Sequence, residues 1–521
     1  MSKRSSRPGR EVIKQQRKAH KQAQRQLRDK QRAQGLEAPS SATIANHKCP
    51  CKTQEEEGEM RLDAVSAQIK AYRSVLPALL RRLGKITDPR NPRKSKHKLT
   101  VLMVYGILCF AFQMASRREA TREMTKPMFM DNLRLLFPEI ESLPHHDTLA
   151  RLLGQIDLSE LEKAHAGMIE HLIRNKKFCR YLIRGAYPIA IDGTQKFRRS
   201  ELWDAQCLER KARTGKKDQD TDGQPEEENK QYYVYVLEAN LTFHNGMVIP
   251  LLSEILSYTQ GDNEKDKQDC EQRAFHRLAK RLKQRFPRLS IMVLLDGLYA
   301  NGPIMERCRQ YKWDYMIVLK DDSLPSVWEE ADKLLALEKA KRNLHKWGNR
   351  QQRFEWVNEI DYRYRCPKTG KEKKIPVHVA FCSERWEQIA TGSTDVVTKT
   401  ARHVWISSQP LDARTMHERC NLGGRHRWGI EEGILVEKHQ GYVYEHCFSY
   451  DWKVMCGYHY LMRIGHALNV LARYTHALGK HIRELGVRGL IALVRNTIAA
   501  PWIDADKLRQ IAIGPCQLRL E

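Results

Sequence analysis

Residues 187–194 read YPIAIDGT, a short apolar run that ends in Asp-Gly-Thr, and this stretch decides the fold. Residues 290–297 read SIMVLLDG and repeat the pattern, an apolar run followed by Asp-Gly. Short apolar runs bounded by turn residues are typical of buried strands. We therefore expect both runs to be strands of one sheet, with Asp192 closing the first and Asp296 closing the second.

The segments between and after these runs complete an α/β pattern. Residues 231–244 and 247–256 are rich in β-branched, aromatic and aliphatic side chains, so they predict two further strands. Residues 263–286 have helical periodicity, and residues 315–319 predict another strand. Residues 216–230 are polar and predict a surface loop. The order of these elements favours an α/β fold.

The flanking segments differ in pattern from this core. Apolar residues recur at helical spacing from residue 60 to residue 185, whereas residues 353–364, 375–381 and 402–407 resemble strands. The predicted organisation is a basic arm at 1–59, an all-helical domain at 60–185, the first part of the core at 186–346, a β-rich insertion at 347–409, the second part of the core at 410–475, and a helical tail at 476–521.

Charge suggests the partner. The 521 residues include 90 Lys and Arg against 63 Asp and Glu, a formal net charge of +27, so a polyanion is the expected partner and nucleic acid is the commonest one. Residues 1–35 hold twelve basic and two acidic residues with few apolar ones. We expect this arm to be disordered on its own, either as a nucleic-acid arm or as a solubilising tail.

The compartment follows from the cysteines and the apolar segments. Thirteen cysteines lie without regular spacing, and no charged-then-apolar signal segment begins the sequence, so we expect a reducing cytoplasmic environment. The densest apolar stretch, residues 101–112, is too short to span a bilayer and predicts a buried core helix. We expect a soluble protein with no membrane partner.

The two strand-end aspartates, Asp192 and Asp296, are candidate metal ligands. Carboxylates at the ends of strands lie at the rim of a sheet, where α/β proteins place ligands. Two of them on neighbouring strands can hold a pair of divalent ions for phosphoryl chemistry. The alternative is that each Asp-Gly pair merely forms a turn.

A third carboxylate lies in a helical segment predicted at residues 421–439. At about 100° per residue, Glu431 lies about 40° and Lys438 about 20° from Arg427, so all three share one helix face. By the same arithmetic Glu432 and Glu437 point elsewhere. A carboxylate between two cations suits a site that holds a metal and phosphates. A solvated salt bridge between Arg427 and Glu431 is the alternative, and it leaves Lys438 unexplained.

These motifs together resemble a known family. Asp192-Gly193-Thr194, LDGLY at 295–299 and the Arg427, Glu431, Lys438 spacing look like bacterial insertion-sequence transposases of the Asp-Asp-Glu type, in the group with a Tyr-Arg-Glu-Lys signature. The resemblance covers about residues 86–474 and includes DPR at 88–90 and GYVYEH at 441–446. One departure is that Gly424 stands where the signature has its tyrosine.

The resemblance implies a ribonuclease-H-like catalytic core with a β-rich insertion, preceded by the helical domain and the basic arm. Asp192 on the first strand, Asp296 on the fourth and Glu431 on a later helix would be catalytic and would bind Mg²⁺, with Mn²⁺ able to replace it. Arg427 and Lys438 would contact DNA phosphates. The chemistry would be cleavage of the element's ends followed by joining of the 3′-hydroxyl to target DNA.

The same resemblance implies partners and leaves alternatives open. The partner would be double-stranded DNA, both element ends and target, with the helical domain contributing to binding and a homodimer or larger assembly formed on the DNA in the bacterial nucleoid. A catalytically inactive descendant and a metal-dependent nuclease without strand transfer remain alternatives. Trp356, Trp386 and Trp405 are candidates to stack a flipped base, although strand aromatics more often form the core. His145-His146 before Asp147 predicts a helix cap rather than a metal site.

Overall fold

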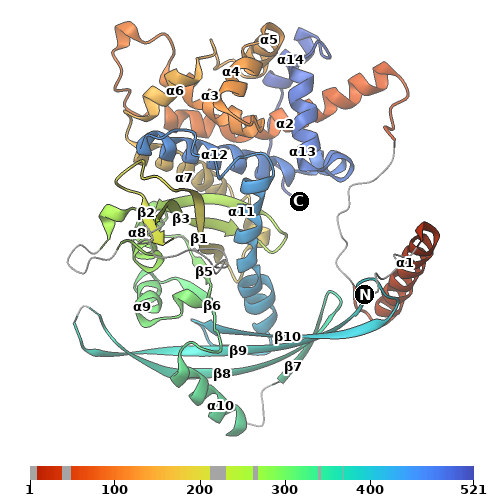
Figure 1. The fold of residues 1–521 in the computed structure, drawn as a ribbon, viewed down its shortest axis with the longest axis vertical. Coiled ribbons are helices and arrows are strands. Elements are labelled where there is room, and N and C mark those ends of the chain that lie inside the picture. The colour runs from red at the N-terminus through yellow and green to blue at the C-terminus, as the bar shows by residue number, and fades with distance from the viewer. Residues whose placement is uncertain (1–8, 38–47, 212–229, 262–267, 338–341, 368) are drawn as a thin grey trace, which may run out of the picture. The chain divides into compact units, whose positions relative to one another are not determined.

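The computed structural model describes residues 9–37, 48–211, 230–261, 268–337, 342–367 and 369–521. Two compact units make up the chain (Figure 1). The larger unit contains residues 43–294 and 426–521, and the smaller unit contains residues 1–42 and 295–425. Most of the polar loop expected at 216–230 lies outside the described residues.

The N-terminal part of the larger unit is helical, as expected. Its helices are α2 (Gln54–Leu83), α3 (Leu99–Ala111), α4 (Arg117–Met124), α5 (Pro127–Leu136), α6 (His146–Leu153) and α7 (Leu158–Arg174). The apolar helix α3 is buried along nearly its whole length and contacts α2 and α6, which confirms that it is a core helix. Within the described residues, no helix is both long and apolar enough to cross a membrane.

The sheet of the larger unit follows these helices. Its strands are β1 (Tyr187–Arg199), β2 (Leu208–Lys211), β3 (Lys230–Thr242), β4 (Val248–Ile255) and β5 (Ile291–Leu295). β3 lies between β1 on one side and β2 and β4 on the other, all antiparallel, while β5 pairs with the other edge of β1 in parallel. The mixed α/β architecture predicted from the sequence is thus confirmed.

Helices cover both faces of this sheet (Figure 1). On one face, Val234 and Val236 of β3 pack against α12 (Trp452–Arg473), and α11 (Gly429–His439) contacts β1, β3 and β4. Side chains alternate along a strand, so Tyr235 points to the other face. There its hydroxyl donates to Glu271 of α8 (Glu271–Arg285), at 2.7 Å. The expected helical tail is present as α13 (Gly479–Ile498) and α14 (Ala505–Ile513).

The smaller unit is an antiparallel sheet with three helices. Its strands are β6 (Asp314–Val318), β7 (Arg342–Trp347), β8 (Arg350–Arg365), β9 (Glu372–Ile389) and β10 (Val396–Ser407), in the spatial order β6-β10-β9-β8-β7, and its helices are α1 (Arg10–Ala33), α9 (Gly302–Tyr311) and α10 (Pro325–Leu337). The strands expected at 353–364, 375–381 and 402–407 are present and longer than predicted.

The prediction that the basic arm is disordered was wrong for α1. Lys, Arg, Gln and Ala favour helix, and these residues dominate the segment. The helix also packs on β9 with few apolar residues: Leu27 and Gln31 are buried, and Gln31 donates its side-chain amide to the carbonyl of Glu387, at 2.9 Å. Lys30 forms an ion pair with the Glu387 carboxylate, at 3.2 Å. Polar contacts therefore hold α1 on β9, although α1 has too few apolar residues to do so by itself.

Candidate active site

Asp192 lies inside β1 rather than at its end, which corrects the prediction. The strand continues to Arg199, because the polar residues after Asp192 pair with β3. The apolar half of β1 pairs with β5, and the last registered pair is Ala190 with Leu294. Asp192 is registered with Glu238, so the two side chains share the sheet face that α11 covers.

Arg427 brings Asp192 and Glu431 together. Its guanidinium lies 3.5 Å from Asp192 Oδ2 and 2.7 Å from Glu431 Oε1. The salt bridge expected as the alternative is thus present, but only its carboxylate is solvated: the Glu431 side chain is 37% exposed, whereas the Arg427 side chain is 6% exposed and its Nε is buried with no hydrogen-bond partner among the described residues. Two carboxylates from a strand and a helix thus converge on one buried cation.

The prediction that Arg427 lies in the same α-helix as Glu431 and Lys438 was wrong. The segment predicted as one helix from residue 421 contains a π-helical turn at His417–Gly423 and a 3-10 turn at Gly424–Trp428, and α11 begins only at Gly429. Arg427 precedes the α-helix and reaches Glu431 through the tighter turn. Glu431 and Lys438 both lie on α11, seven residues apart, and so share a helix face.

Lys438 has a carboxylate partner that the sequence argument did not foresee. Its Nζ lies 3.2 Å from Glu445, within the run GYVYEH at 441–446. Tyr442 and Tyr444 of this run are fully buried, and Tyr442 accepts a hydrogen bond from Asn469 of α12, at 2.8 Å. The motif therefore anchors the loop that follows α11 and places a carboxylate beside Lys438.

Asp296 directly follows β5 and belongs to the smaller unit. It caps the short turn Gly297–Tyr299 by accepting a hydrogen bond from Leu298 N at 2.9 Å, as an Asp-Gly turn requires. One carboxylate oxygen also lies 3.8 Å from Lys320 Nζ. The side chain remains partly exposed.

A buried network behind α11 was missed from the sequence. Arg463 of α12 lies 3.0 Å from Glu437 of α11 and 3.1 Å from Glu238 of β3. His466 bonds Glu437 at 2.6 Å, and His459 lies 3.3 Å from Glu238. All five side chains are buried. The spacing of the three α12 residues, four and then three, is a polar stripe on an otherwise apolar helix, and this signal could have been recognised.

Electrostatics holds both network carboxylates in the charged form. Burial alone would raise the pKa of Glu238, but Arg463 and His459 outweigh burial and lower it from 4.5 to about 2. Burial likewise opposes ionisation of Glu437, yet Arg463 and His466 hold its pKa below the usual value. Burial lowers the pKa of nearby Lys196 to about 8. Glu238, Glu437 and Arg463 are thus charged at neutral pH, whereas burial lowers the pKa of His459.

This shift predicts acid sensitivity. A carboxyl whose pKa is lower in the folded state stabilises the fold above its unfolded pKa, and that contribution disappears as pH falls. For Glu238 the loss should run from about pH 4.5 down to about pH 2. Melting temperatures from pH 7 to pH 2 should fall less steeply for Glu238→Gln than for wild type. Parallel curves would contradict the assignment.

The insertion tryptophans are mostly core residues. Trp356 and Trp405 are buried, while Trp386 lies under the guanidinium of Arg350, 4.2 Å from its ring centre. A Cβ added at Gly424 would lie 2.8 Å from the Trp405 indole nitrogen. A tyrosine at position 424 would therefore require Trp405 to move, which gives a steric reason for the departure from the signature.

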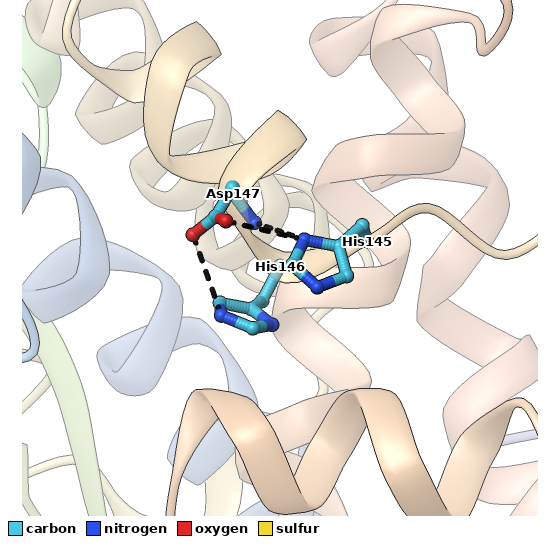
Figure 2. Close-up of side chains that lie close together, drawn as sticks. All are labelled: His145, His146 and Asp147. Carbon is cyan, nitrogen blue, oxygen red and sulfur yellow. Dashed lines mark hydrogen bonds and ion pairs between the residues drawn. The ribbon is translucent and has the colours of Figure 1, made fainter.

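Figure 2 shows a second group of metal-ligating side chains, at the start of α6. The Asp147 carboxylate lies 3.4 Å from His145 and 3.3 Å from His146. His145 Nδ1 accepts a hydrogen bond from Asp147 N, which confirms the predicted cap. Burial lowers the pKa of His146; Asp147 opposes this shift, while His145, Arg117 and Arg118 add to it. We assign this group to the helix cap.

Part of the helical segment matches a known protein family. Residues 80–168 match the family model described as DDE_Tnp_1-associated. The matched segment runs from the end of α2 into α7. It indicates a transposase family of the DDE type and so points to a DNA-modifying enzyme. No curated protein matched the chain.

Proposed function

We propose that this protein is a bacterial insertion-sequence transposase of the Tyr-Arg-Glu-Lys group. It cleaves the DNA at the ends of its element and joins the freed 3′-hydroxyl to target DNA. The observation that carries the proposal is the convergence of Asp192 and Glu431 on Arg427, in a chain whose helical segment matches a DDE-associated family.

The strand arrangement supports a ribonuclease-H-like core. Three antiparallel strands, β1, β3 and β4, are followed by α8 and by β5, which is parallel to β1. Since Ala190 is registered with Leu294, Asp192 and Asp296 each follow the registered pair by two residues. In this proposal Asp296 joins Asp192 and Glu431, as the resemblance of LDGLY at 295–299 to the family's motif implies.

The carboxylates of Asp192 and Glu431 are donors of the kind that divalent metal ions bind. Mg²⁺ prefers carboxylate oxygens, and one carboxylate oxygen of Asp192 and one of Glu431 approach the same guanidinium. When bound, two such ions would activate the attacking oxygen and stabilise the leaving oxygen. The buried Arg427 fixes the two carboxylates relative to each other. Lys438 supplies a cation on the face of Glu431 for a phosphate of the cleaved strand.

Overall the reaction comprises a hydrolysis and an exchange. In the first, water replaces the 3′ oxygen at the phosphorus, and that oxygen leaves with a proton as a 3′-hydroxyl. In the second, this hydroxyl attacks a target phosphodiester, so that one such bond forms as another breaks. Element-end and target DNA are the partners, and we expect a homodimer or larger assembly on DNA.

The experiment uses the purified full-length chain, Mg²⁺ or Mn²⁺, and a duplex carrying the inverted repeat that flanks the gene. A 3′-hydroxyl nick at the repeat boundary, and its joining to a target plasmid, are the expected products. Nicking without joining would favour the nuclease alternative. Binding without nicking in either metal would favour an inactive descendant.

Lys438 provides a sharper test of the site. If its cation contacts a phosphate, Lys438→Ala should lose a contact of about 1.5–3 kcal/mol, and cleavage should fall about tenfold to a hundredfold. The matched control is Glu445→Gln, which removes the ion pair but keeps the cation; because Glu445 is mostly exposed, little activity should be lost. Equal losses in cleavage rate for the two variants would assign Lys438 a structural role.

A further inference from the structure

A hollow of about 220 Å³ lies on the larger unit, and neither Asp192 nor Glu431 lines it. Its walls come from the end of α2 and Lys85 two residues beyond it, one face of α7, and the end of α8. The hollow overlaps the segment that matches the DDE-associated family but includes α8, which lies beyond that match.

The charge of the hollow is positive. Arg82, Lys85 and Arg285 line it, and no ion pair of these three is seen among the described residues, although Arg285 interacts electrostatically with the buried carboxylate of Glu162. Its two acidic residues already have partners on the same helix. Glu160 pairs with Lys163, and Glu170 pairs with Arg174 at 2.5 Å. Three cations are thus left to face a ligand.

Gly167 gives Arg82 its place in the hollow. A Cβ on Gly167 would lie 2.0 Å from Arg82 Nε, so the guanidinium stem crosses α7 where only a glycine allows it. Arg82 also donates to the carbonyl of Ala78, at 3.1 Å, which orients it. Glycine inside a helix destabilises that helix relative to alanine, so this residue has a packing role here.

The pKa of the neighbouring His171 also indicates a positive electrostatic potential. The pKa of His171 is lowered by burial and then by three arginines, Arg82, Arg81 and Arg174. Positive charge therefore extends from the hollow along this side of α2 and α7.

We propose that this hollow binds a backbone phosphate of duplex DNA, gripped by the guanidinium groups of Arg82 and Arg285 and the ammonium of Lys85. Guanidinium forks match phosphate oxygens, whereas an ammonium acts as a point charge. The choice of DNA as the source of the phosphate rests on the proposed function. The site would hold DNA through residues other than those proposed for catalysis.

The test is the salt dependence of duplex binding, measured with the full-length protein in EDTA so that cleavage plays no part. Each phosphate contact contributes about 0.9 to the slope of log affinity against log salt. Arg82→Ala with Arg285→Ala should lower that slope by about one. Gly167→Ala keeps every charge but displaces Arg82, and should also weaken binding. Arg151 is an exposed cation of α6 outside the hollow, so Arg151→Ala is the control. It should keep the wild-type slope, and it would lower the slope as much as the other variants only if the loss of any positive charge weakened binding.

The outcomes separate this proposal from the proposed function. Wild-type slopes for the Arg82, Arg285 and Gly167 variants, with normal melting temperatures, would overturn the hollow as a DNA site and leave the catalytic proposal intact. An equal effect of Arg151→Ala would overturn it too. If the variants had reduced slopes but the protein never cleaved DNA, the hollow would be supported as a DNA site and the catalytic proposal would not. A further outcome is that inorganic phosphate competes with duplex DNA for the wild-type protein while the variants bind duplex normally. That result would show a site for free anions and would overturn the assignment of the hollow to DNA.

Discussion

Asp192→Asn, Asp296→Asn and Glu431→Gln should each abolish metal-dependent cleavage of element-end DNA. Each change replaces a charged oxygen ligand with an amide, and Mg²⁺ binds charged oxygens. Losing several kcal/mol of charge stabilisation corresponds to a fall of about a thousandfold or more. The measurement is single-turnover nicking of a labelled duplex, with DNA binding and melting temperature followed in parallel.

Glu432→Gln is the matched control for Glu431→Gln. It removes an equal charge from the next residue of α11, which points about 100° away around the helix. Full activity of Glu432→Gln beside an inactive Glu431→Gln would localise the requirement to one helix face. Near-normal nicking by any of the three carboxylate variants would remove that residue from the metal site.

The buried position of Arg427 makes its own substitution informative. Because it contacts both Asp192 and Glu431, its loss leaves two carboxylates facing each other without the cation between them. The contact between Arg427 and Glu431 is the one that the salt-bridge alternative expected, and in the structure Asp192 shares it. A 3-10 turn rather than an α-helix joins the two residues.

Short-range patterns in the sequence predicted much of the fold. The apolar runs around Ile191 and Leu294 became β1 and β5, and the alternating segments after residue 350 became β8, β9 and β10. These patterns report burial and period, which neighbouring residues determine. The continuation of β1 beyond Asp192 was missed, because its polar half is held by pairing with β3 rather than by its own apolar content.

Long-range polar contacts could not be derived in the same way. Glu238, Glu437 and Arg463 are separated by up to 225 residues, and their meeting depends on how β3, α11 and α12 pack. The helical periodicity correctly predicted that Glu437 and Glu431 lie on different faces of the helix. It could not predict that Glu437 faces a buried arginine. The docking of α1 on β9 was missed for the same reason, since its contacts are polar and distant in sequence.

The buried network leads to the largest expected effect on stability. Arg463 lies between Glu238 and Glu437, and all three side chains are 0–1% exposed. Arg463→Met would leave two buried carboxylates without their shared cation. Breaking a buried ion pair by removing one partner costs about 3–5 kcal/mol, so we expect a loss of that size in the free energy of unfolding, measured in urea.

A triple variant tests whether charge or volume causes the loss. Arg463→Met combined with Glu238→Gln and Glu437→Gln removes all three charges while nearly conserving volume, and neutral replacements of buried ion pairs are often tolerated. The triple variant should therefore recover much of the stability that the single variant loses. The deficit of Arg463→Met should also shrink as pH falls from about 4.5 to about 2, because wild type then loses the stabilisation that ionised Glu238 provides. If the triple variant were no more stable than Arg463→Met, the loss would come from packing around the methionine, and the charge network would not be what holds α11 and α12 against β3.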